Sequence, residues 1–256
     1  MASSRAAQAL PWLEPGDPFP PVSSAWGEHD PAPGLLAAGG VLDVPTLLSA
    51  YAKGIFPWFS AGQPVLWWST DPRMVLQPKS FRLHRSLRKT LKKLLEAHRL
   101  EIRFDHSFES VIRACAETPR DGQDGTWILP AMVQAYVRLH RAGAAHSVET
   151  WIDGELAGGL YCICLGQMVY GESMFSRRPD ASKLALAALV GFCLEHEIKL
   201  IDCQQDTRHL RSLGAESMAR RCFCLHIEQA IRKPSPDWHF DPVYWKHLLN
   251  QPDSSQ

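Results

Sequence analysis

The sequence predicts an α+β protein in which a small N-terminal domain precedes a larger domain built on a mixed sheet. Two strand-like runs flank Asp153-Gly154, a dipeptide typical of tight antiparallel hairpins. A third strand-like run, 167–176, is followed by an apolar helical run over 181–197 and a further strand-like run over 198–204. A strand–helix–strand unit is expected to be a right-handed crossover between parallel strands. Antiparallel and parallel pairs should therefore share one sheet.

The chain is predicted to divide into three parts. These are a small N-terminal domain over residues 1–72, a larger domain over 73–240 and a polar tail over 241–256. Prolines crowd the start of the first domain and favour an irregular, extended lead. A short helix should follow, with Asp43 as its N-cap and Gly54 at its end. The tryptophan-rich run 56–73 should then form a pair of strands around Ala61-Gly62.

The larger domain is predicted to begin with helices. Leucines at helical spacing predict a helix over 81–98, and a second helix over 104–116 should have Asp105 as its cap. A further helix is predicted over 130–142, before the strands of the mixed sheet.

Composition and charge limit the functional classes. The chain of 256 residues is 45% hydrophobic and 21% charged, which allows a sizeable core. Lys+Arg and Asp+Glu both number 27, so binding of nucleic acid would need a local basic patch rather than an overall positive charge. The N-terminus lacks the apolar segment of a signal peptide, and no run approaches the roughly 20 apolar residues that span a bilayer.

The seven cysteines indicate a reduced, cytoplasmic protein without a metal centre. Seven is an odd number, and the spacing of the two close pairs, Cys162/Cys164 and Cys222/Cys224, differs from that of zinc sites. We therefore expect unpaired, mostly buried thiols, a cytoplasmic location and no membrane association.

A basic stripe is predicted along the helix over 81–98. Six Lys and Arg residues and no acidic residue occur between Arg82 and Lys93. Solvated helix faces usually alternate the two signs of charge, which favours a phosphate backbone as the partner over a merely solvated surface. The residues of the stripe expected to contact a phosphate backbone are Arg85, Arg88, Lys89, Lys92 and Lys93.

Four tryptophans lie in or beside predicted loops, namely Trp58, Trp67, Trp68 and Trp127. Such residues either anchor the core of a small domain or form the wall of a pocket for an apolar or aromatic ligand group. Both interpretations stay open, and the glycine-containing loop before Trp127 favours the second one for that residue.

Polar side chains follow two of the predicted strands to their ends. Glu172 lies near the end of the run 167–176, and Asp202 and Gln204 end the run 198–204. Ligands gather at the carboxyl ends of parallel crossover strands, so these side chains are expected to lie close together. Alternation along a strand should turn Asp202 and Gln204 to one face and Cys203 to the other. Each residue alone could be a loop brace or a surface residue, whereas the three together predict a site.

The order of eight short motifs resembles that of the leucyl/phenylalanyl-tRNA–protein transferase family. The resemblance covers about Phe19 to Ile231, and the motifs are GLLAAGGVL, GIFPWF, LWWSTDPR, DGTWI, AHSVETW, GESMFSR, ASKLAL and IDCQ. It implies an acetyltransferase-like (GNAT-like) catalytic domain behind a small N-terminal domain. It also implies transfer of Leu or Phe, with Met as a further candidate, from aminoacyl-tRNA to the N-terminal Arg or Lys of a protein, which marks that protein for degradation. No metal ion, ATP or other cofactor is implied.

The resemblance assigns the residues that would bind the donor. Met174, Phe175 and Leu189 would surround the apolar side chain of the transferred amino acid, and Trp58 and Trp127 would stack near the terminal adenosine of the tRNA. The basic stripe would hold the acceptor stem, and the enzyme would act as a monomer.

It also assigns the residues that would act on the acceptor. Glu172 would lie near the cationic N-terminal residue of the acceptor, because a buried carboxylate suits Arg or Lys. Asp202 and Gln204 would handle the attacking α-amine, with the final proton acceptor left open. Backbone N–H groups or the hydroxyls of Ser173 and Ser176 would stabilise the oxyanion.

Two stretches depart from the family pattern. Residues 205–207 are Gln-Asp-Thr, where the family more often has an apolar residue and an asparagine, and Val169 and Leu189 stand where bulkier aromatics can occur. A looser pocket would follow. Three alternatives fit less well: an acetyl-CoA N-acetyltransferase needs a glycine-rich loop that 176–182 lacks, a non-catalytic tRNA-binding module leaves the polar cluster unexplained, and a peptidoglycan-bridge aminoacyltransferase leaves GIFPWF and IDCQ unexplained.

Overall fold

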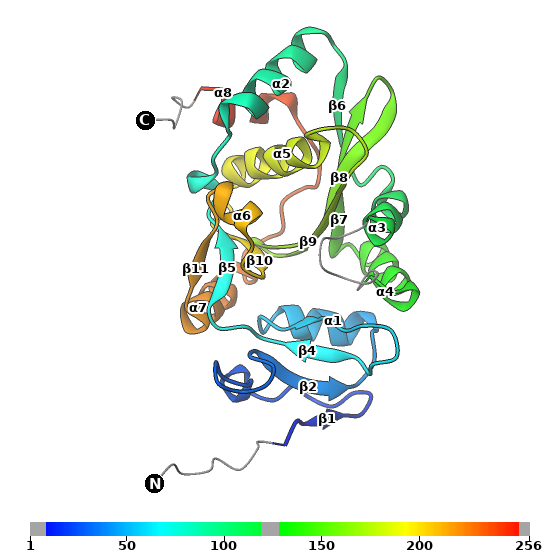
Figure 1. The fold of residues 1–256 in the computed structure, drawn as a ribbon, viewed down its shortest axis with the longest axis vertical. Coiled ribbons are helices and arrows are strands. Elements are labelled where there is room, and N and C mark those ends of the chain that lie inside the picture. The colour runs from blue at the N-terminus through cyan, green and yellow to red at the C-terminus, as the bar shows by residue number, and fades with distance from the viewer. Residues whose placement is uncertain (1–8, 119–127, 251–256) are drawn as a thin grey trace.

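Two sheets organise the chain in a computed structural model, which describes residues 9–118 and 128–250. A four-stranded sheet has the strand order β1-β2-β4-β3, and a seven-stranded sheet has the order β11-β5-β10-β9-β8-β7-β6. The smaller sheet lies at the N-terminal end of the molecule, and the larger sheet with its helices forms the rest (Figure 1). This arrangement confirms the predicted α+β class with a small N-terminal part.

The strands of the smaller sheet are β1 (Trp12–Leu13), β2 (Leu35–Gly39), β3 (Phe56–Pro57) and β4 (Leu66–Trp68). Helix α1 (Val44–Tyr51) begins at Asp43, whose Oδ1 accepts a hydrogen bond of 2.8 Å from the backbone N–H of Thr46. The predicted N-cap is therefore confirmed, because this bond satisfies a donor that the helix itself leaves unpaired. Strands β3 and β4 pair antiparallel, as predicted for the tryptophan-rich run.

The strands of the larger sheet are β5 (Arg73–Leu76), β6 (Leu100–Phe104), β7 (Ala145–Ile152), β8 (Glu155–Leu165), β9 (Met168–Ser176), β10 (Ile201–Gln204) and β11 (Glu216–Met218). Among these described strands, β9 and β10 pair in parallel and the other pairs are antiparallel. Helix α5 (Ala181–Glu195) connects β9 to β10. The predicted parallel crossover and the hairpin between β7 and β8 at Asp153-Gly154 are both confirmed.

Helices cover both faces of the larger sheet. On β8, Leu160 and Cys162 belong to the core cluster of α5, whereas Tyr161 and Ile163 belong to the cluster of α3 (Phe108–Glu117) and α4 (Pro130–Arg141). Because successive side chains of a strand point to opposite faces, α5 covers one face and α3 with α4 covers the other (Figure 1).

The remaining helices are α2 (Arg85–Glu96), α6 (Arg208–Ser212), α7 (Arg220–Ala230) and α8 (Lys246–Leu249), with 3-10 turns at Val22–Ser24, Pro78–Ser80 and Pro242–Trp245. Helix α2 begins later than predicted, because Phe81 and Leu83 precede it and are already buried in the core. The predicted helices 130–142 and 181–197 agree with α4 and α5 to within two residues at each end.

The predicted helix cap at Asp105 is wrong. Helix α3 starts at Phe108, with Ser107 in the N-cap position. Asp105 instead accepts a hydrogen bond of 2.7 Å from the backbone N–H of Ser147, 42 residues away, and its other oxygen lies 2.7 Å from Nδ1 of His146. Asp105 therefore joins the end of β6 to β7, a pairing that no local sequence pattern reveals.

The C-terminal segment differs from the predicted polar tail. Tyr244, Trp245 and Leu248 are buried in the same core cluster as α5. These side chains cover the outer side of α5, which explains why that helix is apolar around almost its whole circumference.

Candidate functional site

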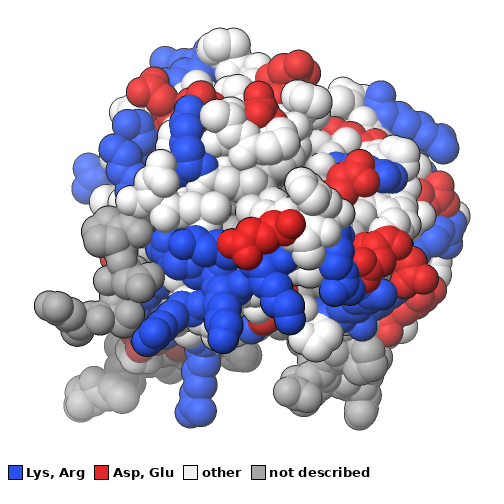
Figure 2. Space-filling model, turned by 90° about the horizontal axis from the view of Figure 1, so that it is seen from above, with Lys and Arg blue, Asp and Glu red and all other residues white. Residues whose placement is uncertain are grey.

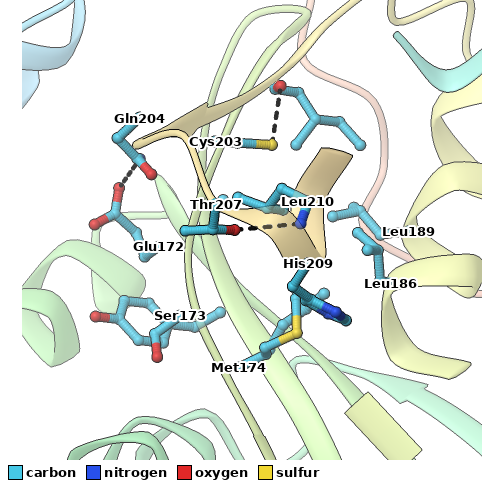
Figure 3. Close-up of a pocket in the computed structure, with 14 residues that line it drawn as sticks. Glu172, Ser173, Met174, Leu186, Leu189, Cys203, Gln204, Thr207, His209 and Leu210 are labelled. Carbon is cyan, nitrogen blue, oxygen red and sulfur yellow. Dashed lines mark hydrogen bonds between the residues drawn. The ribbon is translucent and has the colours of Figure 1, made fainter. Parts of the chain in front are cut away.

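The candidate site lies where strands β9 and β10 separate. The strands pair at Ile201↔Val169 and Asp202↔Tyr170, and the register of β10 against β5 shifts between Asp202 and Gln204. Strand β9 continues beside β8 as far as Ser176. A cavity of about 350 Å³ opens here between the two strands, α5 and α6 (Figure 3). This volume falls within the range of small-molecule sites, about 300–1,000 Å³.

The wall of the cavity is mainly apolar. Two leucines of α5, Leu186 and Leu189, lie three residues apart and so share one helix face toward it. Helix α6 contributes His209, and its N-cap residue Thr207 also lines the cavity, so both add polar atoms to the wall (Figure 3). The other lining side chains that carry apolar surface are Leu160, Tyr161, Met174, Ile201, Cys203 and Leu210. Such a lining suits an unbranched or branched apolar group of amino-acid size.

Polar groups gather at one end of the cavity, around Glu172. The side-chain Nε2 of Gln204 donates a hydrogen bond of 3.2 Å to Oε1 of Glu172 (Figure 3). The hydroxyl of Tyr136, on α4, donates a bond of 3.2 Å to Oε2, and the hydroxyls of Tyr136 and Tyr51 share a hydrogen bond of 2.5 Å. Tyr170 in turn donates to the backbone oxygen of Tyr51 over 2.7 Å. The carboxyl group is thereby fixed by residues of α1, α4 and β10.

Burial raises the pKa of Glu172 to about 8, although the hydroxyls of Tyr51 and Tyr136 act in the opposite direction. The same burial, together with the Glu172 carboxyl group, raises the pKa of both tyrosines well above their usual value. At neutral pH the carboxyl of Glu172 is therefore mostly protonated, and a cation or an amine that enters the cavity would favour its ionised form. A carboxyl group with a pKa near the working pH is suited to exchange protons with a substrate.

Asp202 has a different environment from the one predicted. Its side chain is 0% exposed and does not line the cavity. Its two oxygens accept hydrogen bonds of 2.8 Å each from Nε and Nη2 of Arg73, and Oδ1 also accepts one of 2.9 Å from the backbone N–H of Gln204. Asp202 therefore contacts Gln204 through the backbone from outside the cavity, and its role in handling the amine stays a prediction.

The cause is a break in strand alternation. Asp202 and Gln204 were predicted on one face, with Cys203 on the other. Gln204 has a left-handed backbone (φ 53°), and the register shift beside it lets both Cys203 and Gln204 line the cavity while Asp202 points to Arg73. Bulges of this kind redirect side chains and are frequent beside active sites.

The other predicted donor-site residues divide into two groups. Ser173, Met174 and Leu189 line the cavity. Phe175 is buried in the core cluster of α3 and α4, on the opposite face of the sheet, because it follows Met174 on the strand. The hydroxyl of Ser176 donates to the backbone oxygen of Arg178 at the exposed strand end, so it does not line the cavity.

The tryptophans also divide. Trp67 is fully buried and donates its indole N–H to Gly39, which makes it a core anchor of the small sheet. Trp58 is partly buried and packs against Trp68, with ring centroids 5.3 Å apart, and the indole of Trp68 donates to the backbone oxygen of Trp58. Trp127 lies outside the described residues.

Helix α2 carries the predicted basic stripe with one correction. Arg85, Lys89, Lys92 and Lys93 are exposed, whereas Arg88 is 9% exposed and donates to the backbone oxygen of Leu249. Arg88 therefore anchors the C-terminal segment and does not face solvent with the others. Viewed from the α2 end of the molecule, Lys and Arg side chains gather into a continuous area with few acidic side chains within it (Figure 2).

Three polar residues of this region were not predicted from the sequence: Arg73, Tyr51 and Tyr136. Arg73 ends the motif LWWSTDPR, and Tyr51 lies just before GIFPWF, so both motifs contain or adjoin a residue of the network. Tyr136 falls on the apolar face of α4, where an aromatic residue indicates core packing. Its second role, the hydrogen bond to Glu172, is visible only in the tertiary structure.

Two absences apply to the described part of the chain. No group of three or more His, Cys, Asp and Glu side chains there is placed to hold a metal ion. No helix there is long and apolar enough to cross a bilayer. All seven cysteines are described, and none forms a disulfide.

Comparison with known proteins shows the family of the chain. The family model for "Leucyl/phenylalanyl-tRNA protein transferase" matches residues 75–228, and that for its N-terminal domain matches residues 40–71. A protein of that name from Polaromonas sp. is 65% identical over 240 residues, covering 94% of each chain, and one from Albidiferax ferrireducens is 59% identical with the same coverage. Among solved structures, a GCN5-related N-acetyltransferase from Kribbella flavida aligns with 67% of this chain and 60% of its own, at 11% identity and a TM-score of 0.32. The matched stretches contain Tyr51, Glu172, Asp202 and Gln204, and the chain belongs to the leucyl/phenylalanyl-tRNA protein transferase family of aminoacyltransferases.

Proposed function

We propose that this enzyme transfers Leu or Phe, with Met as a further donor, from aminoacyl-tRNA to the N-terminal Arg or Lys of acceptor proteins. The product carries a new peptide bond, and the transferred residue marks the protein for degradation. The observation that carries this proposal is the combination of an apolar cavity with a carboxyl group of raised pKa at its polar end.

The apolar cavity supports a Leu or Phe donor. Leu186, Leu189 and Met174 offer apolar surface on several sides, and a flexible thioether adapts to side chains of different shape. A charged donor side chain would lose its hydration there without a compensating ion pair, which costs several kcal/mol. The site therefore favours apolar amino acids as a class, and its Leu and Phe preference is set by its width near Leu189.

The polar end supports a cationic acceptor. Glu172 is partly buried and lies beside Gln204, so an incoming ammonium or guanidinium group would meet a carboxyl group that it can ionise. An acidic N-terminal residue would place two carboxyl groups together and would be rejected. This contrast is the physical basis of the proposed Arg and Lys rule.

The reaction is the aminolysis of an ester. The neutral α-amine of the acceptor attacks the carbonyl carbon, a C–N bond forms, and the bond to the ribose oxygen of the tRNA breaks. Free α-amino groups have a pKa of about 7.7–8.0, close to the value of about 8 for Glu172. Proton transfer from the α-ammonium group of the acceptor to an ionised Glu172 is therefore nearly balanced in energy and supplies the neutral amine. The proton that the nitrogen loses as the C–N bond forms then passes to the leaving ribose oxygen.

Gln204 is proposed to orient the amine rather than to accept its proton, because an amide binds protons very weakly. Its Nε2 already donates to Glu172, which leaves its carbonyl oxygen to accept a hydrogen bond from the amine. Positioning of two large substrates in this way contributes strongly to rate. The oxyanion would be stabilised by backbone N–H groups or by the hydroxyl of Ser173, which lines the same cavity.

We further propose that the exposed basic residues of α2 contact the tRNA backbone, and that Trp58 and Trp127 stack near its terminal adenosine. The contact on α2 would be made by phosphate recognition and would not depend on base sequence. A cytoplasmic monomer fits this reaction, since its donor is a tRNA and its seven cysteines are unpaired.

The direct test is transfer of radiolabelled leucine from Leu-tRNA to a peptide that begins with Arg. A peptide identical except for an N-terminal Glu is the control. Transfer to the Arg peptide alone is the expected result. Equal transfer to both peptides would contradict the acceptor rule, and no transfer with tRNA binding intact would contradict the proposed reaction.

A further inference from the structure

Arg73 and Asp202 form a buried ion pair directly behind the candidate site. The two side chains are 1% and 0% exposed, and the guanidinium meets the carboxylate through two parallel hydrogen bonds of 2.8 Å. This two-point geometry fixes the carboxylate in orientation as well as in position. Removal of one member would leave the other as an uncompensated buried charge.

The guanidinium also contacts two aromatic rings. Its central carbon lies 4.6 Å from the ring centroid of Phe56 and 4.7 Å from that of Phe223. Phe56 belongs to β3 of the small sheet, two residues before Trp58, and Phe223 belongs to α7. Nη1 of Arg73 has no hydrogen-bond partner among the described residues. The two aromatic rings are therefore the neighbours that stabilise the part of the guanidinium that Asp202 does not bind. Arg73 therefore connects Asp202 to the small sheet.

Both carboxylate oxygens of Asp202 accept hydrogen bonds from groups outside the cavity lining or from the backbone. Oδ2 accepts from Arg73, and Oδ1 accepts both from Arg73 and from the backbone N–H of Gln204. The last bond holds Gln204 in its left-handed conformation, which a non-glycine residue adopts at a cost. That conformation turns the Gln204 side chain toward Glu172 (Figure 3).

We propose that Arg73 is a positioning residue for aminoacyl transfer, and that it acts by holding Asp202 as the anchor of the Gln204 backbone. In this arrangement Asp202 is not the proton acceptor of the reaction. The inference rests on the proposed function of Gln204 and Glu172, and it extends that function to a residue of LWWSTDPR. A chain of contacts then runs from Phe56 through Arg73 and Asp202 to Gln204.

The first test compares Arg73→Lys with the wild-type enzyme. Lysine keeps the charge but cannot make two parallel hydrogen bonds, so the carboxylate would turn and Gln204 would lose its fixed orientation. We expect kcat to fall about 10- to 100-fold, the loss typical of a displaced catalytic geometry, with KM for Leu-tRNA within about twofold of wild type. An unchanged kcat for Arg73→Lys in an active preparation would overturn the inference.

A matched control separates positioning from general stability. Arg220 also bridges α7 to the chain before β5, because its Nη1 donates a bond of 2.6 Å to the backbone oxygen of Ser69, but it contacts none of the site residues. Arg220→Met should lower the melting temperature without the selective loss of kcat. If both variants lose kcat in proportion to their melting temperatures, Arg73 is only structural and the inference fails.

The second test decides whether Asp202 is an anchor or a proton acceptor. Asp202→Asn places an amide NH₂ against the guanidinium and should be strongly impaired. In the double variant Arg73→Met with Asp202→Asn, that conflict is removed and the asparagine oxygen can still accept from Gln204 N–H. We expect the double variant to regain at least about tenfold in kcat over Asp202→Asn, since a lost proton acceptor would cost 10²–10⁴-fold in both. Equal, very low activity in both, with the Gln204 N–H as protected from hydrogen exchange in the double variant as in the wild type, would assign the proton to Asp202 and overturn the proposal.

A readout independent of activity distinguishes failure of this inference from failure of the proposed function. Amide hydrogen exchange, measured by mass spectrometry, should show a protected Gln204 N–H in the wild type and at least a tenfold faster exchange in Arg73→Lys. Faster exchange in an enzyme that transfers no amino acid would retain the anchor and refute the proposed reaction. Unchanged exchange would refute the anchor itself.

Discussion

Gln204 Nε2 lies 3.2 Å from Oε1 of Glu172, and this hydrogen bond spans the gap between two strands at the point where they separate. The bond places an amide and a carboxyl group of raised pKa together at the polar end of an apolar cavity. Strands β9 and β10 pair on one side of this bond, and the cavity lies on the other side. A shift in the position of either strand would therefore move both side chains. The predictions below use this relationship.

The first prediction concerns the pH dependence of stability through Glu172. Its pKa is raised from 4.5 to about 8 in the folded protein, so the folded state keeps a proton that the unfolded chain releases above about pH 4.5. The contribution of this group is fully present below pH 4.5 and is lost as the pH rises to about 8. Glu172→Gln removes that loss and should gain about 1–4 kcal/mol in unfolding free energy relative to wild type between pH 5 and pH 8, since one pKa unit corresponds to about 1.4 kcal/mol.

Urea unfolding at the two pH values, on both proteins, measures this difference. The variant should also lose transfer activity, because glutamine cannot take a proton from the α-amine. A stability difference that is the same at pH 5 and pH 8 would show that Glu172 is ionised in the folded protein.

The second prediction concerns Tyr136. Its hydroxyl donates to Oε2 of Glu172 and lowers the pKa of that carboxyl group, although burial has the larger, raising effect. Tyr136→Phe should therefore raise the pKa of Glu172 further and move the acidic limb of the kcat/KM–pH profile to higher pH. Tyr244→Phe changes a tyrosine that packs beside α5 and should leave the profile in place. An unshifted profile for Tyr136→Phe would mean that Glu172 does not titrate in the reaction.

The third prediction concerns the width of the donor cavity at Leu189. Leu189→Ala should enlarge the cavity and raise the Phe to Leu ratio of kcat/KM by about tenfold, the order of discrimination that one or two carbon groups give. Leu184→Ala is the matched control, because Leu184 is a fully buried leucine of the same helix that does not line the cavity. Both variants should lose about 2–5 kcal/mol of stability, but only the first should change the ratio. A similar shift for both would place the specificity elsewhere.

The fourth prediction concerns the basic residues of α2. Replacement of Arg85, Lys89 and Lys92 by Ala should weaken tRNA binding and make the slope of log K against log salt shallower by about 2–3, because each phosphate contact contributes about 0.7–0.9. The control replaces Arg99, Arg103 and Arg113, which are paired with Asp153, Glu101 and Glu109. An unchanged slope for the α2 variant would mean that these side chains form only a solvated surface.

Arg88 should behave differently from its neighbours on α2. It is mostly buried and bonds to the backbone of Leu249, so Arg88→Ala should lower the melting temperature more than it changes the salt slope. This contrast follows from tertiary packing, since the sequence places Arg88 among equivalent basic residues.

The sequence by itself determined the features that rest on local chemistry. The N-cap at Asp43, the turn at Asp153-Gly154 and the apolar helix between two strands each depend on residues within a few positions of one another. The family resemblance and the approximate meeting of Glu172 with Gln204 were likewise available, because crossover strands bring their carboxyl ends together.

The tertiary structure alone decided what surrounds those residues. Arg73 and Asp202 are 129 residues apart, Tyr51 and Tyr136 are 85 apart, and neither pairing leaves a periodic pattern in the chain. The register shift beside Gln204 arises from how β10 pairs with β5, so simple alternation placed Asp202 in the cavity when it is in fact the buried anchor behind it. Local propensity fixes which elements form, whereas long-range pairing fixes which side chains become desolvated, and desolvation is what sets the chemistry of this site.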